Sequence, residues 1–269
     1  MNKNTTITSA DGTPLNLVQW DVDSPKAQVL LLHGLAEHMG RYEHVAAALN
    51  AAGYSVAGLE LRGHGHSGGK RGHVEDWADY RADVRSALDE LGEVFLVSHS
   101  MGGIVTADSL LHDSRGVRGW VSSNPLFGVR FEPPRWKVSG SRLLNKLVPR
   151  LSLGNELDTN WLSRDAQVVE RYEADPLVYG TVTPRWYMSL LAAQERAFSR
   201  AAELKTPLMS FVSNGDKICS PDATKRFVDA CGSDDKGHKV YEELYHELFN
   251  EPEKEQVLAD VVSWLDAHA

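Results

Sequence analysis

Short apolar runs alternate with amphipathic segments along most of the chain. The runs are typical of strands buried on both faces, and they cover residues 29–32, 54–59, 94–97, 117–121, 208–212 and 239–244. Apolar positions at helical spacing follow them, in segments 45–52, 74–91, 104–111, 224–230 and a closing helix that begins near Pro252. Strands that alternate with helices predict an α/β fold, with a mostly parallel central sheet flanked by helices. A turn at Asp11 and Gly12 adds a hairpin near the start of the chain.

One stretch, residues 124–202, departs from this alternation. It holds no clear strand, and prolines interrupt its short helical patterns. A plain loop of that length is uncommon inside a compact domain. We therefore predict a helical cap (lid) at 124–202, inserted into an α/β core formed by residues 1–123 and 203–269.

Composition excludes several classes of protein. The formal net charge is −9 and no basic stripe runs along the chain, which argues against a nucleic-acid partner. The start of the chain lacks the apolar segment of a signal peptide, and no apolar run is long enough to span a bilayer. The two cysteines, Cys219 and Cys231, form neither a disulfide framework nor a zinc motif. We expect a cytoplasmic protein.

The first candidate for chemistry is Ser100, in the sequence Ser98-His99-Ser100-Met101-Gly102-Gly103. It follows a predicted strand and precedes a predicted helix, which is the setting of a nucleophile elbow. The tight turn there demands small residues on either side of the serine. Gly102 meets this demand, and Ser98 replaces the first glycine of the usual pattern.

Two further candidates follow later strands. Asp216 comes after the strand at 208–212, and His246 comes after the strand at 239–244. The ends of parallel strands meet at one edge of an open sheet, where ligands bind. The chain order serine, aspartate, histidine is the order of α/β-hydrolases. Asp222 is the competing acid, but its place after a proline suits the first turn of a helix.

These residues predict a catalytic triad with defined roles. Ser100 is the nucleophile, His246 the general base, and Asp216 the acid that orients the imidazole. The oxyanion needs two preorganised donors, and we expect the backbone N–H groups of Leu35 and Met101 to supply them. His64 and His66 lack a carboxylate or thiol that would complete a metal site, so no metal is expected.

At this point the sequence resembles a known family. The resemblance rests on five segments in order: 33–42 (HGLAEHMGRY), 62–68 (RGHGHSG), 99–103 (HSMGG), 175–177 (DPL) and 246–251 (HELFNE). It is similar to the monoglyceride lipase and lysophospholipase-like α/β-hydrolases, a group of serine aminopeptidase type. The resemblance implies hydrolysis of a lipid-like carboxylic ester, most of all a monoacylglycerol, without cofactor or metal. It also implies the same triad and the same oxyanion donors. Ser98 and Glu60 depart from the family pattern, which has glycine and aspartate there.

Several alternatives stay open. A general carboxylesterase on short acyl esters and a lysophospholipase would use the same triad. A carbon–carbon bond hydrolase, a cofactor-free haloperoxidase and a catalytically silent receptor are further possibilities on this fold. A dehalogenase or an epoxide hydrolase would need aspartate in place of Ser100.

Two groups of residues suggest supporting roles. Glu37, His38 and Arg41 follow the oxyanion segment, and we expect a buried charged network there that fixes Leu35; direct contact of these side chains with the substrate is the alternative. In the cap, Leu143, Leu144, Leu147, Val148 and Leu151 recur beside the cations Arg135, Lys137, Arg142 and Lys146. Such a pattern suits peripheral contact with an anionic membrane or micelle. A cap helix packed on the body with solvated charges explains it equally well. Tyr172, also in the cap, either lines the lid or has a purely structural role.

Overall fold

The computed structural model describes residues 3–131 and 133–269, and of Arg135 it describes the backbone only. An eight-stranded sheet forms the centre of the fold, in the order β1-β2-β4-β3-β5-β6-β9-β10. The strands are β1 (Lys3–Thr8), β2 (Pro14–Trp20), β3 (Gln28–Leu32), β4 (Ser55–Leu59), β5 (Val94–His99), β6 (Val117–Ser123), β9 (Leu208–Ser213) and β10 (Lys236–Tyr241). β1 and β2 pair antiparallel, β2 also pairs antiparallel with β4, and all other pairs are parallel. The predicted mostly parallel sheet is confirmed.

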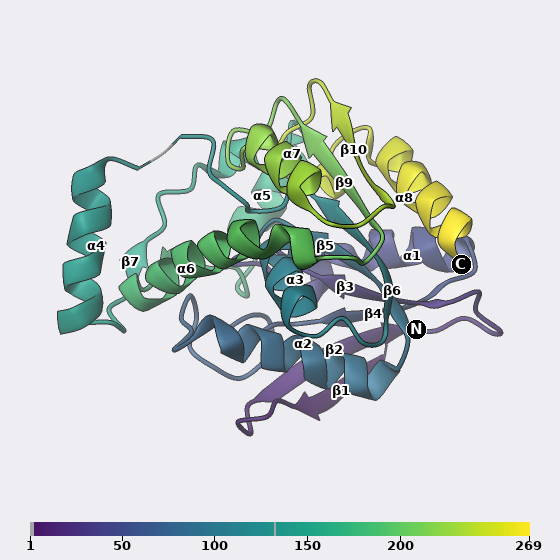
Figure 1. Ribbon diagram of the computed structural model, residues 1–269, viewed down its shortest axis with the longest axis horizontal. Coiled ribbons are helices and arrows are strands. Elements are labelled where there is room, and N and C mark those ends of the chain that lie inside the picture. The colour runs from purple at the N-terminus through teal and green to yellow at the C-terminus, as the bar shows by residue number, and fades with distance from the viewer. Residues whose placement is uncertain (1–2, 132) are drawn as a thin grey trace.

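Helices cover both faces of the sheet (Figure 1). α1 (Glu43–Ala51) and α8 (Lys254–His268) pack on one face, with Val29 and Leu31 of β3 in their core. The other face carries α2 (Trp77–Leu91), α3 (Met101–His112), α6 (Pro184–Arg200) and α7 (Pro221–Ala230), with Leu30 and Leu32 among them. Successive residues of a strand point to opposite faces, so an entirely apolar strand such as β3 belongs to two cores.

The predicted position of the last strand is wrong by three residues. β10 is an edge strand, and its side chains are mostly exposed or half-buried. Leu244, which prolonged the apolar pattern, is buried in the loop beyond the strand, where its carbonyl accepts from the Ser213 hydroxyl. As a result, His246 sits in a longer loop than the sequence suggested.

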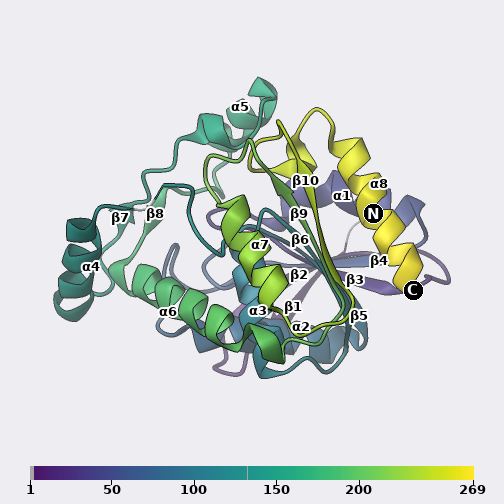
Figure 2. The ribbon, with the colours of Figure 1, turned by 45° about the horizontal axis from the view of Figure 1, so that its top comes forward.

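The segment between β6 and β9 contains the residues predicted as a cap. Its elements are α4 (Arg135–Leu147), β7 (Leu153–Gly154), η2 (Thr159–Trp161), α5 (Ala166–Ala174), β8 (Thr181–Val182), α6 and η3 (Ala201–Glu203). β7 and β8 form a small antiparallel pair, which two-residue strands are too short to reveal as a pattern. α6 runs back along the body, and α4 lies beside the end of α6 that is farthest from the central sheet, in both views (Figures 1 and 2). Within the described residues, no helix has the length and apolar character needed to cross a bilayer.

Candidate active site

Ser100 occupies a strained turn between β5 and α3. Its backbone has φ 51° and ψ −117°, a region that residues with a Cβ rarely adopt. The second residue of the neighbouring helix has no room for a side chain, because a Cβ on Gly102 would lie 2.5 Å from the Leu32 carbonyl oxygen. The turn therefore has the geometry of a nucleophile elbow, with the hydroxyl held above the carboxyl ends of the strands.

The structure brings the three predicted triad residues together. His246 Nε2 lies 2.9 Å from Ser100 Oγ, and His246 Nδ1 lies 2.9 Å from Asp216 Oδ2. The other oxygen of Asp216 accepts from the backbone N–H groups of Ile218 and Cys219, at 2.7 and 3.1 Å. The carboxylate is thereby fixed toward the imidazole. Asp222 is exposed on the first turn of α7 and takes no part in this arrangement.

The electrostatics of His246 follow from its neighbours. Burial lowers its pKa, but the Asp216 carboxylate and Cys219 together raise it by more, so the pKa lies well above the ordinary histidine value. The ring of His99 lies 4.7 Å away. Burial, followed by the proximity of His246, lowers the pKa of His99 to about 4. His99 is therefore neutral near pH 7 and adds no second positive charge beside His246.

Two residues of this site could not be singled out from the sequence. Asn124 donates its side-chain amide to the carbonyl of His246 at 2.8 Å and accepts from the Ser213 N–H at 2.9 Å, which ties the histidine loop to β9. The thiol of Cys219 is buried beside the triad, and burial raises its pKa. Cys219, Asp216 and His246 are potential metal ligands whose donor atoms lie within 4.8 Å of one another. Both nitrogens of His246, however, are already engaged by Ser100 and Asp216.

The predicted oxyanion donors lie beside the serine. Met101 is the first residue of α3, so its N–H has no partner within the helix. Leu35 follows Gly34, whose position is so close to the serine that a Cβ there would lie 3.2 Å from Ser100 Cβ. In the part of the chain that the structure describes, neither N–H group meets an acceptor. Both are therefore available to a developing negative charge.

A buried charged network holds the oxyanion segment in place. Glu37 Oε1 accepts from the Gly34 N–H at 2.6 Å and from the Tyr42 hydroxyl at 2.8 Å. Its other oxygen accepts from Arg41 at 2.6 Å, and Arg41 forks onto both oxygens of Glu247 at 2.7 Å. Burial would raise the pKa of Glu37, but Arg41, His99, His33 and the Gly34 N–H together outweigh it, and the pKa falls to about 2. The network links the residue before Leu35 to the residue after the catalytic-base candidate, as the sequence led us to expect for Glu37 and Arg41.

The two histidines of the glycine-rich loop, His64 and His66, lie in different environments. His64 is buried, and its Nε2 lies 2.6 Å from the hydroxyl of Tyr179 in the cap segment. His66 is exposed, and its backbone N–H donates to Glu60 at 2.6 Å. Glu60 also accepts from Met39 N–H and from the Asn16 amide, at 3.2 and 3.0 Å. Glutamate in place of aspartate thus connects the glycine-rich loop to the oxyanion segment.

The second departure from the family pattern has a structural partner. Ser98 Oγ accepts a hydrogen bond from the indole N–H of Trp120 at 2.8 Å, and both side chains are buried. A glycine at position 98 would leave that indole without an acceptor. The serine is therefore explained by the tryptophan on the neighbouring strand β6.

An apolar cavity of about 220 Å³ lies over Ser100. Its floor comes from the core and includes Leu35, His99 and His246. Its walls come from the cap segment and are mostly apolar, namely Leu157, Leu162, Tyr172, Val182, Trp186, Tyr187 and Leu190. Of these, only Tyr172 was a candidate from the sequence, and its ring packs under the Arg41 guanidinium at 4.7 Å. A cavity of this composition suits an acyl chain.

Comparison with known proteins places this geometry in a family. A model described as serine aminopeptidase, S33, matches residues 23–253. The chain belongs to this family. A monoacylglycerol lipase from Mycolicibacterium smegmatis is 37% identical to it, over 93% of this chain and 91% of the relative. Phospholipase YtpA of Bacillus subtilis is 30% identical, over 93% and 98%. The crystal structure of Paleococcus ferrophilus monoacylglycerol lipase matches with a TM-score of 0.87 and 31% identity, covering 100% of both chains.

Membership of the S33 family confirms two predictions made from the sequence. The resemblance to monoglyceride lipase-like proteins is confirmed by the family match and by these relatives. The α/β-hydrolase fold is confirmed by the structural match over the whole chain. The chain is a carboxylic ester hydrolase of that fold.

Proposed function

We propose that the protein is a monoacylglycerol lipase that releases a fatty acid and glycerol through an acyl-enzyme. The observation that carries the proposal is the apolar cavity directly over Ser100, enclosed by residues of the segment 124–202. That segment acts as a cap on the core of residues 1–123 and 203–269. The names of the relatives from Mycolicibacterium smegmatis and Paleococcus ferrophilus support the same substrate class.

The proposed reaction uses the residues in these roles. Ser100 Oγ attacks the ester carbonyl while His246 Nε2 takes its proton, and the N–H groups of Leu35 and Met101 stabilise the oxyanion. His246 then donates that proton to the departing glycerol oxygen, which leaves an acyl-serine. Water attacks the acyl-serine with His246 again as base, and the fatty acid is released. Asp216 keeps the imidazole in the required tautomer and stabilises its protonated form.

The test is hydrolysis of a monoacylglycerol series and a matched p-nitrophenyl ester series, with Ser100→Ala as control. We expect a preference for medium or long monoacylglycerols and loss of all activity in the control. Cleavage of short esters alone would reject the lipase and leave a carboxylesterase. Activity that survives Ser100→Ala would reject the nucleophile.

We further propose that α4 rests on a lipid surface. Its large apolar side chains point to solvent, with Trp136 72%, Leu143 58% and Leu147 69% exposed. Lys146, on the same helix, is also exposed and suits anionic lipid, whereas the side chain of Arg135 lies outside the described residues. The exposed apolar face favours this interpretation over a cap helix packed on the body. The two buried free thiols, Cys219 and Cys231, support a cytoplasmic location.

Vesicle co-sedimentation tests the lipid contact. The variant Leu143→Glu/Leu147→Glu should lose binding to anionic vesicles, because it places charge on the apolar face. Its hydrolysis of a soluble p-nitrophenyl ester should remain that of the wild type, which shows that the fold is intact. Unchanged sedimentation would refute the contact.

A further inference from the structure

Both sides of Gly34, the residue before the proposed oxyanion donor, are held by buried side chains. Its N–H donates to Glu37, and its carbonyl accepts from His33 Nδ1 at 2.7 Å. This carbonyl belongs to the same peptide group as the N–H of Leu35. The peptide bond is trans, so the carbonyl and the N–H point in opposite directions. A hydrogen bond that fixes the Gly34 carbonyl therefore also fixes the direction of the Leu35 N–H.

The protonation of His33 suits this contact. Its Nε2 accepts from the Leu61 N–H at 3.1 Å, and the Gly34 carbonyl can only accept, so the ring proton lies on Nδ1. Burial lowers the pKa of His33, which keeps the ring neutral near pH 7. A hydrogen bond donated to a peptide carbonyl also polarises the peptide group, and linked hydrogen bonds strengthen one another in a buried site. The contact from His33 can therefore make the Leu35 N–H a better donor.

A second buried histidine connects His33 to the cap segment. The ring centroids of His64 and His33 lie 4.8 Å apart. His64 Nδ1 donates to the Arg62 carbonyl at 3.0 Å, so its Nε2 is the acceptor for the Tyr179 hydroxyl at 2.6 Å. Burial, followed by the proximity of His33, lowers the pKa of His64 well below the ordinary histidine value. The neutral ring is thus oriented by one partner in the core and one in the cap segment.

Tyr179 also contacts the oxyanion segment through its backbone. Its N–H donates to the Ala36 carbonyl at 3.4 Å. Ala36 has a φ of 66°, in the left-handed region that residues with a Cβ rarely adopt. Such a conformation persists only where the surrounding structure holds it. Because Ala36 directly follows Leu35, one cap residue contacts both the strained backbone beside the proposed donor and the histidine pair that holds it.

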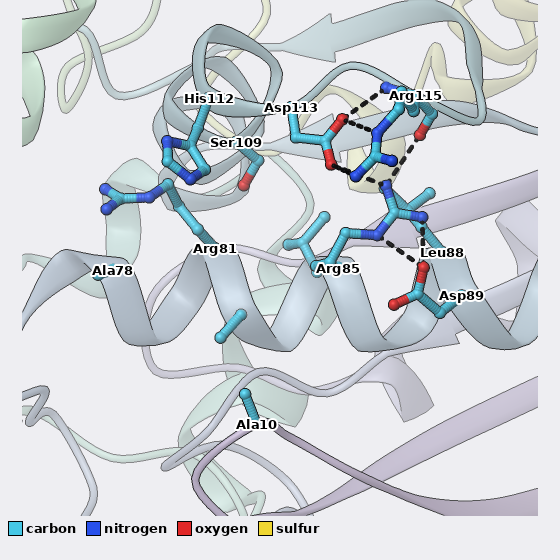
Figure 3. Close-up of a pocket in the computed structure, with 12 residues that line it drawn as sticks. Ala10, Ala78, Arg81, Arg85, Leu88, Asp89, Ser109, His112, Asp113 and Arg115 are labelled. Carbon is cyan, nitrogen blue, oxygen red and sulfur yellow. Dashed lines mark hydrogen bonds and ion pairs between the residues drawn. The ribbon is translucent and has the colours of Figure 1, made fainter.

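Polar contacts elsewhere join one part of the core to another. In the pocket between α2 and α3, Arg85 pairs with Asp89 at 2.8 Å and Arg115 with Asp113 at 2.7 Å (Figure 3). The residues that line this pocket all lie within 1–123. Contacts of that kind stabilise the body alone, whereas those of Tyr179 join the cap segment to the oxyanion segment.

We propose that Tyr179 is a positioning residue for the oxyanion hole. Its hydroxyl keeps His64 against His33, and His33 in turn directs the Leu35 N–H toward the site. The position of the cap segment is thereby coupled to the strength of the oxyanion hole. This inference rests on the proposed function, because it takes Leu35 as an oxyanion donor for the ester attacked by Ser100.

The first test is Tyr179→Phe, which removes the hydroxyl and keeps the ring and the backbone contact. The substrate is p-nitrophenyl butanoate, so the result does not depend on a monoacylglycerol as the natural substrate. We expect kcat/KM to fall about five- to tenfold, the size of one lost hydrogen bond, while KM changes little.

Inhibition by decyl trifluoromethyl ketone reports on the oxyanion hole directly. Ser100 Oγ adds to the ketone carbonyl, its proton passes to His246, and the hemiketal oxygen becomes negative, as in the transition state. The inhibition constant should therefore rise in Tyr179→Phe by the same factor by which kcat/KM falls. A change that merely loosened the fold would not link these two quantities.

Variants of His33 test the path from Tyr179 to the donor. His33→Leu removes the N–H that holds the Gly34 carbonyl and should lower kcat/KM about a hundredfold, close to the loss of one oxyanion donor. His33→Asn places an amide N–H₂ near the position of Nδ1 and should restore most of that loss. In the His33→Leu background, Tyr179→Phe should have little further effect, because the two residues act in series.

Two variants outside this path serve as controls. Tyr54→Phe removes a hydroxyl that donates to Asp266 of α8 at 2.7 Å, and Arg85→Gln removes an ion pair of the pocket in Figure 3. Both should leave kcat/KM and inhibition by the ketone unchanged. A loss with either control as large as with Tyr179→Phe would overturn the proposal, because it would indicate a general effect of lost polar contacts.

The remaining outcomes separate the inference from the proposed function. A wild-type kcat/KM in Tyr179→Phe would overturn the inference. A lower kcat/KM without weaker inhibition by the ketone, or additive losses in the double variant with His33→Leu, would also overturn it. No reaction of the wild-type protein with either the ester or the ketone would overturn the proposed function itself.

Discussion

The hydrogen bond between Ser98 and Trp120 allows a test of why this chain has serine at position 98, where the family pattern has glycine. The Ser98→Ala and Ser98→Gly variants remove the acceptor and leave the indole N–H buried without a partner. Ser98→Gly is the more telling change, because it restores the residue that the family pattern has at this position. We expect it to destabilise the protein all the same.

The magnitude follows from the burial of both groups. Ser98 is 1% exposed and Trp120 is fully buried, so water cannot replace the lost acceptor. A buried donor left without a partner costs about 1–3 kcal/mol. Glycine inside a strand adds roughly 0.5–1 kcal/mol to that cost. Single domains are stable by about 5–15 kcal/mol, so both variants should still fold.

A double-mutant cycle with Trp120→Phe isolates the bond from other effects. Phenylalanine keeps the aromatic packing against Phe127 and Phe227 but has no N–H. Urea unfolding should show that Ser98→Ala costs about 1–3 kcal/mol in the wild type and close to nothing in the Trp120→Phe background. Equal costs in both backgrounds, or a neutral Ser98→Gly, would refute the reasoning. Measuring kcat for each variant checks that the elbow itself is unchanged.

Three other changes test the site. Because Asp216 raises the pKa of His246, the wild-type rate should fall with decreasing pH, starting above the ordinary histidine pKa of about 6.5. In Asp216→Asn, kcat/KM should be about 10⁴-fold lower, and this residual activity should persist to lower pH than in the wild type. An acidic limb of the pH–rate profile that stays in place in the variant would contradict Asp216 as the cause of the raised pKa. Glu37→Gln turns an amide N–H₂ toward Arg41. The free energy of unfolding, measured by urea titration, should therefore fall by about 3 kcal/mol, and kcat, measured by steady-state kinetics, should fall by roughly a hundredfold. A wild-type kcat in this variant would exclude a positioning role for Glu37. Gly102→Ala forces a Cβ against a backbone oxygen of β3 and should lower the melting temperature or prevent folding; a thermal melt like that of the wild type would show that the turn has spare room.

The sequence predicted those parts of the site in which a reactive residue type directly follows a recognisable strand. Ser100, Asp216 and His246 follow strands whose apolar runs are clear, and the ends of parallel strands converge at one edge of a sheet. Their meeting could therefore be predicted without coordinates. The same holds for Leu35 and Met101, because an oxyanion hole lies at fixed offsets from the elbow and from the third strand's exit.

The missed features depend on pairings that a single sequence does not contain. Trp120 reaches Ser98 because β6 pairs with β5 in a register that sets it opposite Leu96, on the face that Ser98 shares. Asn124 holds His246 across more than a hundred residues of chain. The cap residues that wall the cavity are mostly apolar, and an apolar side chain looks the same in a sequence whether it faces a core or a substrate.

The edge strand illustrates a different limit. β10 has one neighbour and is half-exposed, so its composition resembles a loop, while the buried Leu244 beyond it resembles a strand residue. Apolar pattern reports burial and not hydrogen-bond pairing. The error moved the strand and left the order of the catalytic candidates unchanged.

The cap segment is attached to the body unevenly. Around α5 it is joined to the catalytic loops, through His38 with Asp175 at 2.8 Å, His64 with Tyr179 at 2.6 Å and Arg164 with Glu251 at 2.6 Å. α4 stands apart from those contacts at the outer end of α6 (Figure 2). The region around α5 is thus tied to the loops beside His246, whereas α4 is joined to α6, where Arg185 donates to Asn145 at 2.8 Å. Evolution, or an engineer, could replace α4 to change which surface or head group the enzyme meets while the machinery that breaks the ester stays as it is.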